Sequence, residues 1–593
     1  IFDMWIGDWN KTNENWEWQS HTVNDSVIYT PIVIDRNHAF TKVDGVLFKQ
    51  MLKMLSLDFI CNYDSLILKD TKKINKLAFA LDMAVAGRSD ESVWIRQAQE
   101  IRKQMTDSLI DSAFTYLPEG VKHDEIELIK RKLKRRRLEL EAVASQYYRL
   151  LQRTPVVAGT NQSDYFLIER QAPDRTILRI YDPETGDCRL EQQFSGRETK
   201  ELWLYGLAGN DTFEVKGNTR KDFPIYLISG EGENQYQLNH NRKIHVYDKD
   251  YKYDYQKIKY HKISFTPWGI YDSDKGISLG TFFTYTMYGF KRAPFTYQHR
   301  IGYNYLKGFM YAGVFPNYDG RRRLYLNASI SSPRNFENFF GFGNNTAGYK
   351  EEKKNYNRVK LRTYMLNPSF EMDLRKEEVV TFFGSLDMYK AKRTDDRYIY
   401  TVYGEDHPIF RTNYFVGLGA TYRITKQPYS WLPLLETEWT AGWKMNLKKP
   451  ERNFPYAQGS LSWNVRFSDR FTWASLMKGT VLFDNDYEFY QAATIDLRGF
   501  RDNRFIGKQS FYQYSDLRLD MGKLKNPFTP LKYGLFAGFD YGRVWFPGER
   551  SHSWHTSYGG GIWLTFLNKF TTKYSWFGST DSFRFAFELG LGF

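Results

Sequence analysis

The chain ends in the stretch FRFAFELGLGF, Phe583 to Phe593, which alternates without a break between apolar residues and residues that are mostly small or charged. Side chains of a β-strand point to opposite faces in turn, so the large apolar residues here share one face. That face carries Phe583, Phe585, Phe587, Leu589, Leu591 and Phe593. Six apolar residues in six positions predict the closing strand of a barrel rather than a loose tail.

The same alternation runs through the chain from about residue 262 onward. The stretch SLSWNVRF, 460–467, puts Leu461, Trp463, Val465 and Phe467 on one face and polar residues on the other. ISLGTFFTYTMYGF, 277–290, repeats the pattern. In a transmembrane barrel one face of each strand meets lipid and the other a polar lumen. At about 20 residues for a strand and its connection, 262–593 predicts about 16 antiparallel strands, an even number as in bacterial barrels.

Composition separates this all-β transmembrane barrel from two alternatives. Aromatic residues make up 18% of the 593 residues, yet the mean hydropathy is −0.59. Membrane helices need runs of about 18 or more apolar residues, and the sequence has none. A soluble β-sandwich shares the alternation, but strands of about 10–12 residues are long for that fold. A barrel needs apolar residues at alternate positions alone, so it combines many aromatic residues with a low mean hydropathy.

Two regions precede the barrel. Residues 1–154 predict a mixed, mainly helical domain, with amphipathic stretches near 46–56, 75–86, 92–114 and 124–152. Residues 155–261 predict a small β-rich domain of short strands and glycine turns, such as TILRIYD and DTFEVKG. The chain opens on IFDMWIGDWN without a signal peptide. An outer-membrane barrel must be exported, so either a leader, with or without further sequence, precedes Ile1, or the barrel interpretation is wrong.

A charged stretch interrupts the barrel pattern at DLRGFRDNRF, which follows Ile495. It resembles the Arg-Gly-Phe motif of the BamA and two-partner-secretion transporter superfamily, 16-stranded barrels whose sixth extracellular loop folds into the lumen. GLFAGFDYGRVW, 534–545, is similar to the family's strand motif, an Asp with a Gly two residues on. The resemblance implies a loop-lumen lock formed by Arg498, Gly499, Phe500, Asp540 and Gly542. Five predicted strands follow the loop, as the family requires.

Physical chemistry supports that pairing. A loop that fills a barrel crosses a wet, charged interior, and a guanidinium can bind an inward carboxylate bidentately. Gly499 permits a close backbone approach, and Phe500 packs beside it. The alternative is an extracellular turn with a surface arginine. One position departs from the family, because Gly538 stands where many relatives carry an aromatic residue.

Two further resemblances concern the barrel. The apolar end of the chain, with Leu589, Leu591 and Phe593, resembles the C-terminal signal that the outer-membrane assembly machinery reads. SPRNFENFFGFGNNT, 332–346, resembles a stretch of Bacteroidota barrels that carry a calcineurin-like phosphoesterase domain upstream. The resemblance implies that such a domain would precede Ile1, since its metal-binding motifs are not in this sequence.

The formal charge of +14 is concentrated in KRKLKRRR, 130–137. Such a run fits either a patch for nucleic acid or anionic lipid, or the solvated face of a helix. Apolar residues recur through it at helical spacing and Glu139 and Glu141 follow it, which favours the helix and no nucleic-acid partner. Cys61 and Cys188 have no metal or redox spacing.

Two motifs before the barrel suggest chemistry. YGLAGNDTFEV, 205–215, resembles one calcium-binding RTX turn, in which Asp211 is a weak metal candidate. ISGEGENQYQL, 228–238, repeats its glycines but has Gln235 in place of the Asp, so both stretches predict glycine turns without metal. GDWNKTNENWEW faintly resembles the catalytic loop of atypical kinases, with Asn10, Lys11 and Thr12 for Asp, Arg and His, and Asp35 for the metal Asp. An amide cannot act as the base, so a structural remnant is predicted.

Three functional hypotheses follow. The first is a barrel of the BamA superfamily that translocates or assembles protein or lipid at the bacterial outer membrane, with residues 1–261 in the periplasm. Its partners would be outer-membrane lipids, the assembly machinery, and a lipoprotein or secreted client. The second is a membrane platform for the upstream phosphoesterase. The third is a passive porin, which a loop in the lumen disfavours. No cofactor and no catalytic residue is predicted, and no POTRA repeat is evident in 1–260.

Overall fold

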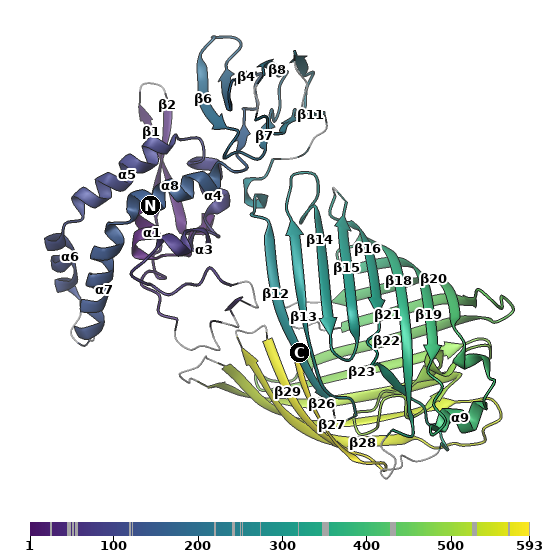
Figure 1. Cartoon of the computed structure of the whole chain (residues 1–593). Coiled ribbons are helices and arrows are strands. Elements are labelled where there is room, and N and C mark those ends of the chain that lie inside the picture. The colour runs from purple at the N-terminus through teal and green to yellow at the C-terminus, as the bar shows by residue number, and fades with distance from the viewer. Residues whose placement is uncertain are drawn as a thin grey trace. The chain divides into compact units, whose positions relative to one another are not determined.

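The computed structural model describes residues 1–593 except 24–25, 44–48, 50–51, 54–56, 118–119, 121–122, 219–220, 240–242, 249–250, 252, 273, 318, 347–354, 427–434, 525–530, 567–569 and 592–593. The chain divides into two compact units (Figure 1). The first comprises Ile1–Tyr260 with Gly289–Lys291, and the second His261–Tyr288 with Arg292–Phe593.

The first unit begins with short helices and one hairpin. The elements are α1 (Phe2–Ile6), β1 (Trp16–Val23), β2 (Ser26–Val33), α3 (Thr71–Ile74), α4 (Phe79–Val85), α5 (Glu91–Gln104), α6 (Asp107–Ala113), α7 (His123–Arg137) and α8 (Leu140–Leu151). Helix α8 forms the centre of this part, because its apolar stripe, Leu140, Val143, Tyr147 and Leu151, is fully buried. Among the described residues, none of the helices is both long and apolar enough to cross a lipid bilayer.

The rest of the first unit is a stack of β-coils. Strands β3 (Val156–Ala158), β7 (Leu202–Tyr205), β9 (Ile225–Ile228) and β11 (Ile244–Tyr247) form one parallel sheet. Strands β4 (Tyr165–Gln171), β8 (Thr212–Gly217) and β10 (Gln235–Leu238) form a second. The chain passes from one sheet to the other at each turn. The hairpin β5 (Arg175–Tyr181) and β6 (Cys188–Ser195) extends the second sheet antiparallel.

The second unit is an antiparallel barrel of sixteen long strands, which confirms the predicted fold class. They are β12 (Lys262–Asp272), β13 (Gly276–Met287), β14 (Tyr297–Asn304), β15 (Gly308–Pro316), β16 (Arg322–Ile330), β18 (Arg358–Arg375), β19 (Glu378–Ala391), β20 (Asn413–Lys426), β21 (Leu435–Asn446), β22 (Asn453–Arg466), β23 (Phe471–Leu482), β26 (Gln509–Leu524), β27 (Leu531–Trp545), β28 (His555–Phe566), β29 (Phe570–Gly578) and β30 (Phe583–Leu591). The short strands β17 (Phe336–Asn338), β24 (Ala493–Thr494) and β25 (Ile506–Gly507) lie in connections.

Alternation sorts the barrel side chains into an outer and a lumenal face. On β13, Ile277 and Leu279 are 63% and 62% exposed, whereas Ser278 between them is 4% exposed. Apolar residues therefore stand on the outside of the wall, the reverse of a soluble protein. Pairing is continuous around the barrel except at the seam, where β12 and β30 pair at two positions within the described residues, against eleven between β12 and β13.

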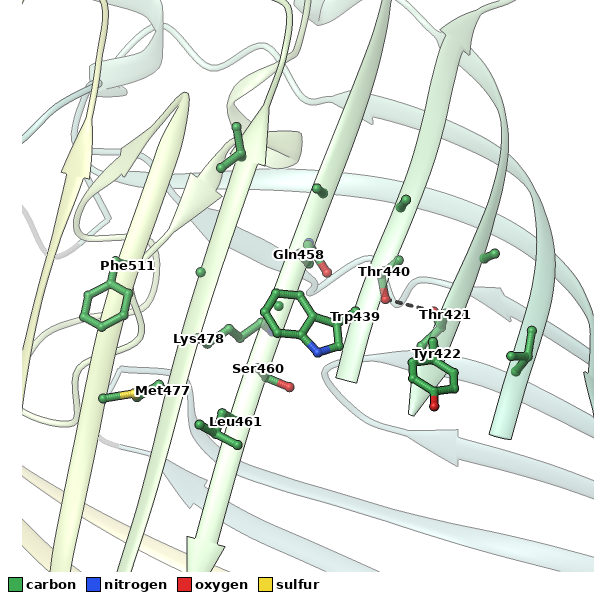
Figure 2. Close-up of a pocket in the computed structure, with 17 residues that line it drawn as sticks. Thr421, Tyr422, Trp439, Thr440, Gln458, Ser460, Leu461, Met477, Lys478 and Phe511 are labelled. Atoms are coloured by element: carbon green, nitrogen blue, oxygen red, sulfur yellow. Dashed lines mark hydrogen bonds between the residues drawn. The ribbon is translucent and has the colours of Figure 1, made fainter. Parts of the chain in front are cut away.

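The outer wall carries a hollow of about 920 Å³ over strands β20 to β23 and β26 (Figure 2). Small residues form its floor, because Ala420, Ala441, Ala457 and Gly459 occupy registered outward positions. Trp439 stands directly opposite Gly459 on the neighbouring strand, and its indole lies over the space that the glycine leaves.

Candidate functional site

Arg498 lies in the connection between β23 and β26, which folds into the barrel lumen. Its Nε donates to both carboxylate oxygens of Asp540 at 3.1 Å, and its backbone N–H donates to Asp540 Oδ2 at the same distance. Its Nη1 donates to Asp516 Oδ1 at 2.6 Å. Asp540 is fully buried on the lumenal face of β27. The structure thus brings together the two residues that the sequence paired, and adds a second carboxylate.

Gly538, which stands where many relatives carry an aromatic residue, leaves room for the guanidinium of Arg498. A Cβ at Gly538 would lie 2.7 Å from Arg498 Nη2 and 2.8 Å from Asp516 Oδ1. The aromatic contact comes from another strand instead, because the ring of Phe577 on β29 lies 3.9 Å from the guanidinium carbon. Stacking on a ring and pairing with two carboxylates together hold a partly buried cation whose desolvation would otherwise be costly.

The next two residues of the motif fix the backbone of the loop. A Cβ at Gly499 would lie 2.6 Å from Ser557 Cβ and 2.9 Å from the carbonyl of Gly578, so the chain passes too close to the wall for any larger residue. Phe500 is buried and packs edge-on against Phe505, with ring centroids 5.3 Å apart. Gly542 lies on β27 opposite Tyr512.

The residues after the motif contact both sides of the seam. Arg501 Nη1 pairs with Asp274 Oδ1 at 2.7 Å, and Asp502 pairs with Lys275 at 2.8 Å, both in the connection between β12 and β13. Arg504 pairs with Asp581 in the connection between β29 and β30. On β30 itself, Arg584 donates to the carbonyl of Phe500. We call Phe500 to Arg504 the seam clasp, because four of these five residues join the first hairpin of the barrel to the last, while Asn503 donates to Glu337 in β17.

The stretch NFFGFGNNT holds the other side of this loop. The N–H of Gly343 donates to Ile506 O at 2.8 Å. Asn344 donates from its backbone and its side chain to Glu549 at 2.7 and 3.0 Å, and Asn344 Nδ2 also donates to Val544 O at 2.8 Å. Phe339 and Phe340 are fully buried. Three connections of the barrel are therefore packed into one cluster.

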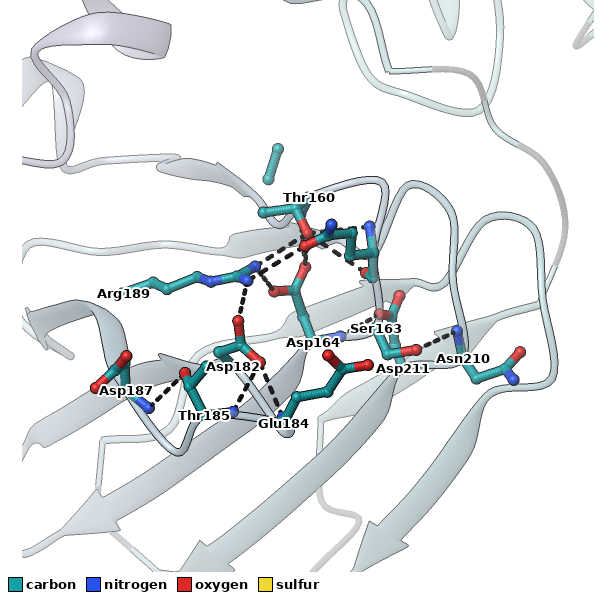
Figure 3. Close-up of polar contacts among 12 residues, drawn as sticks. Thr160, Ser163, Asp164, Asp182, Glu184, Thr185, Asp187, Arg189, Asn210 and Asp211 are labelled. Atoms are coloured by element: carbon teal, nitrogen blue, oxygen red, sulfur yellow. Dashed lines mark hydrogen bonds and ion pairs between the residues drawn. The ribbon is translucent and has the colours of Figure 1, made fainter. Parts of the chain in front are cut away.

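In the first unit, Asp211 belongs to a ladder of stacked turns. Its N–H donates to Asn234 Oδ1, and its own Oδ1 accepts the N–H of Asp164, both at 2.9 Å. Asp164 in turn pairs with Arg189 at 3.0 Å, which also pairs with Asp182 (Figure 3). The parallel register places Asn234, and not Gln235, opposite Asp211. The prediction of Gln235 at this position was therefore wrong by one residue.

The Asp211 carboxyl is fully buried, and its Oδ2 has no hydrogen-bond partner among the described residues. Burial, together with the nearby Asp164 carboxylate, raises the pKa of Asp211 to about 7. A substantial fraction of the Asp211 carboxyl is therefore protonated and uncharged near physiological pH. No group of three His, Cys, Asp or Glu side chains suited to a metal occurs in the part of the chain that the structure describes.

The kinase-like positions form a compact ion cluster. Lys11 is buried and pairs with Asp8 at 2.9 Å and Asp3 at 3.5 Å, and it donates to the carbonyl of Asp35 at 3.1 Å. The backbone N–H of Asn10 donates to Asp8 Oδ1, and the Thr12 hydroxyl donates to Asn15 Oδ1. The amine that stands at the second motif position thus neutralises the acids around it.

The basic run lies on α7 and is used within the unit. Lys130 and Lys134 pair with Glu127 and Asp111, each at 2.8 Å. Arg136 is buried and donates to the carbonyls of Trp5 and Asp64 at 2.7 and 2.9 Å. These contacts are those expected of a helix packed on its own domain.

Sequence reasoning singled out Phe500, but not Asp516, Phe577 or the other four residues of the seam clasp. Alternation along YQYSDLRLDMG puts Asp516 on the lumenal face, but which loop residue meets it depends on how far the loop descends. The clasp pairs span 227 and 77 residues, so no local pattern reveals them. Phe593 lies outside the described residues, and Leu589 and Leu591 lie in β30.

We expect the Arg498–Asp540 contact to behave as one unit. Arg498→Ala leaves a buried carboxylate unpaired and should lower barrel stability by about 3–5 kcal/mol. Asp540→Ala should cost a similar amount, and the double variant little more than either. The heat-dependent gel mobility of the folded barrel measures this. Arg466→Ala, at an exposed turn pair with Asp469, is the matched control. Additive losses in the double variant would contradict direct coupling.

The Asp211 carboxyl predicts a pH dependence of the coil stack. The folded state holds a proton that the unfolded state releases above pH 3.8, so stability should fall as pH rises from about 4 to about 7 and then level off. Asp211→Asn should remove this dependence and, above pH 7, raise the unfolding midpoint by about 4 °C or more, the shift that ~1 kcal/mol gives in a small domain. Temperature-dependent proteolysis within 205–238 measures it. Asp187→Asn, at an exposed acid, is the control, and a less stable Asp211→Asn would refute the neutral acid.

Comparisons with known proteins are limited to the fold. No family model matches the sequence. No curated protein matches it either. Among solved structures, BamA from Haemophilus ducreyi lacking POTRA domains 1–3 aligns at a TM-score of 0.42 and 12% identity, covering 56% of this chain and 71% of that one. CdiB from Escherichia coli aligns at 0.35 and 10% (56% and 62%), and CdiB from Acinetobacter baumannii at 0.34 and 11% (57% and 66%).

Proposed function

We propose that this chain is an outer-membrane barrel of the BamA and two-partner-secretion transporter superfamily, which helps to move or insert polypeptide or lipid at the outer membrane. The observation that carries the proposal is the loop folded into the lumen, with Arg498 bound to a buried carboxylate on the wall. A charged loop that crosses the lumen would obstruct a passive open pore. In a barrel that changes between two states, the same loop can stabilise one state, because the paired arginine holds that state until the ion pair is broken.

The seam is the element that such a change would move. Separating β12 from β30 breaks few backbone hydrogen bonds, because the two strands pair at two positions within the described residues. The seam clasp spans the same gap with ion pairs to Asp274 and Asp581. Since Arg498 and the clasp belong to one loop, withdrawal of the loop from Asp540 would also release the seam. Lumen and seam would therefore open together.

The outer wall supports a membrane location. Its exposed apolar side chains, such as Ile277, Leu279 and Trp439, would meet outer-membrane lipids. Residues 1–261 would lie in the periplasm. The assembly machinery would read the end of the chain during insertion, and a lipoprotein or secreted client would be the working partner.

A reversible lock on the seam tests this function. Tyr271 and Phe587 are registered partners across the seam, so Tyr271→Cys with Phe587→Cys should form a disulfide when Cys61 and Cys188 are first replaced by Ser. We expect oxidation to abolish the outer-membrane assembly or secretion that the native bacterium derives from this protein, and reduction to restore it. Tyr574→Cys with Phe587→Cys joins β29 to β30 away from the seam and is the control. Full function in the oxidised seam variant would refute seam opening and favour the platform for an upstream phosphoesterase.

The C-terminal signal gives a separate prediction. Deleting Phe593 should reduce the amount of folded barrel in the outer membrane, because the assembly machinery would lose the terminal aromatic residue. Phe593→Tyr, which keeps an aromatic end, should insert normally. Fractionation of membranes and heat-dependent gel mobility measure both variants. Normal levels of the deleted form would remove the targeting role.

A further inference from the structure

A hollow of about 260 Å³ lies inside the barrel, apart from the Arg498 contact. Strands β19, β21, β22, β23 and β26 supply its wall, and the loop segment Tyr490–Thr494 supplies its inner side. Its lining includes two lysines, Lys444 and Lys478, together with tyrosine, glutamine and threonine side chains, and no described lining residue is acidic. The charged side chains of the described lining are therefore both cations, and its polar side chains can all donate hydrogen bonds.

The two lysines differ in their partners. Lys444 Nζ pairs with Asp387 at 2.8 Å, so its charge is balanced within the wall. Lys478 forms no ion pair with any residue that the structure describes, and Asp496 acts on it through space without contact. Gly479 pairs with Gly459, which in turn pairs with the outward-facing Trp439, so Gly479 belongs to the outer face and the preceding residue, Lys478, to the lumenal face. Figure 2 shows Lys478 beside Trp439 and Ser460. Among the described residues, Lys478 is thus the one cation of the hollow that no acidic side chain contacts directly.

Further donors on the inner side are also unused. The hydroxyl of Tyr490 and Nε2 of Gln491 are buried and have no hydrogen-bond partner among the described residues. Both side chains are held in place, because the Tyr490 ring stacks on Tyr389 with centroids 4.5 Å apart and Gln491 Oε1 accepts the N–H of Glu488 at 3.1 Å. A buried donor without a partner costs free energy, so an acceptor that reaches these groups would be favoured.

We propose that this lumenal hollow binds a phosphate group, with Lys478 as its charge partner and Tyr490 and Gln491 as added donors. An oxyanion fits the donor excess, since ammonium, hydroxyl and amide N–H groups can all donate to it. Phosphate fits better than carboxylate, because none of the described lining residues is an arginine that could bind a planar group bidentately, whereas lysine binds phosphate as a point charge. The inference goes beyond the proposed function, since it concerns what the lumen binds and does not require the seam to open.

Titration calorimetry on the purified full chain in a phosphate-free non-ionic detergent tests the site, with inorganic phosphate as the probe. We expect the wild-type protein to bind it, and Lys478→Gln to weaken binding about tenfold or more, the usual effect of losing a hydrogen bond to a charged group. Tyr490→Phe removes only a hydroxyl and should weaken binding several-fold. Lys390→Gln removes a charge from the barrel wall outside the hollow and should change nothing. Heat-dependent gel mobility checks that each variant is folded.

Two additional probes refine the result: phosphatidic acid distinguishes a lipid head group from free phosphate, and acetate tests whether the site selects phosphate over carboxylate. Tighter binding of dihexanoyl phosphatidic acid than of inorganic phosphate would support the site and identify a lipid head group as its ligand. Equal or weaker binding would support free phosphate. Equal affinity for acetate would overturn the choice of phosphate. Absence of phosphate binding by the wild type, or undiminished binding by Lys478→Gln, would overturn the site and leave the seam-lock result unaffected.

Discussion

The largely enclosed guanidinium of Arg498, whose side chain is 16% exposed, is the constraint on which the arrangement of the barrel interior depends. A cation enclosed among protein atoms must be paired, and here Asp540, Asp516 and the ring of Phe577 surround it. Those groups come from three different strands, so the arginine has one position that satisfies them all. The loop that carries it must then descend to that depth, and Gly499 must pass the wall without a side chain.

Fixing the loop at this point also fixes what lies on either side of it. On the C-terminal side, the seam clasp reaches the first and last hairpins of the barrel. On the N-terminal side, Tyr490 and Gln491 form the inner side of the hollow that contains Lys478. One loop thus connects the lumenal lock, the seam and the donor-rich hollow. A conformational change that withdrew the loop would open the seam and dismantle the hollow in the same step, which gives the proposed phosphate ligand a way to stabilise the closed barrel.

In the first unit, buried ionisable groups are stabilised by protonation as well as by ion pairs and hydrogen bonds. In the coil stack, Asp164 is paired with Arg189, whereas Asp211 has no cationic partner among the described residues and is predicted to hold a proton instead. Each turn passes one hydrogen bond to the next through a side-chain oxygen, so the ladder continues across three coils. In the helical part, Lys11 and Arg136 are buried with acids or carbonyls around them. Part of the positive charge of the basic run is therefore paired inside this unit, while Arg131 and Arg135 of the run are exposed.

The sequence by itself determined the barrel, because lipid on one side and water on the other impose a period of two that every strand carries locally. It also indicated the Arg498–Asp540 contact through a resemblance of two short motifs. Only the tertiary structure decided the rest. The absence of a side chain at Gly538 is explained by Phe577, which fills that space from another strand. The seam clasp includes a contact between residues more than two hundred positions apart. The coil stack is not evident in the sequence, because its repeat has no fixed period. Asp164 and Asp211 are 47 residues apart, since a hairpin lies between them, whereas Asp211 and Asn234 are 23 residues apart. Contacts that depend on register, loop depth and insertions leave no local pattern, since they arise when distant segments pack together.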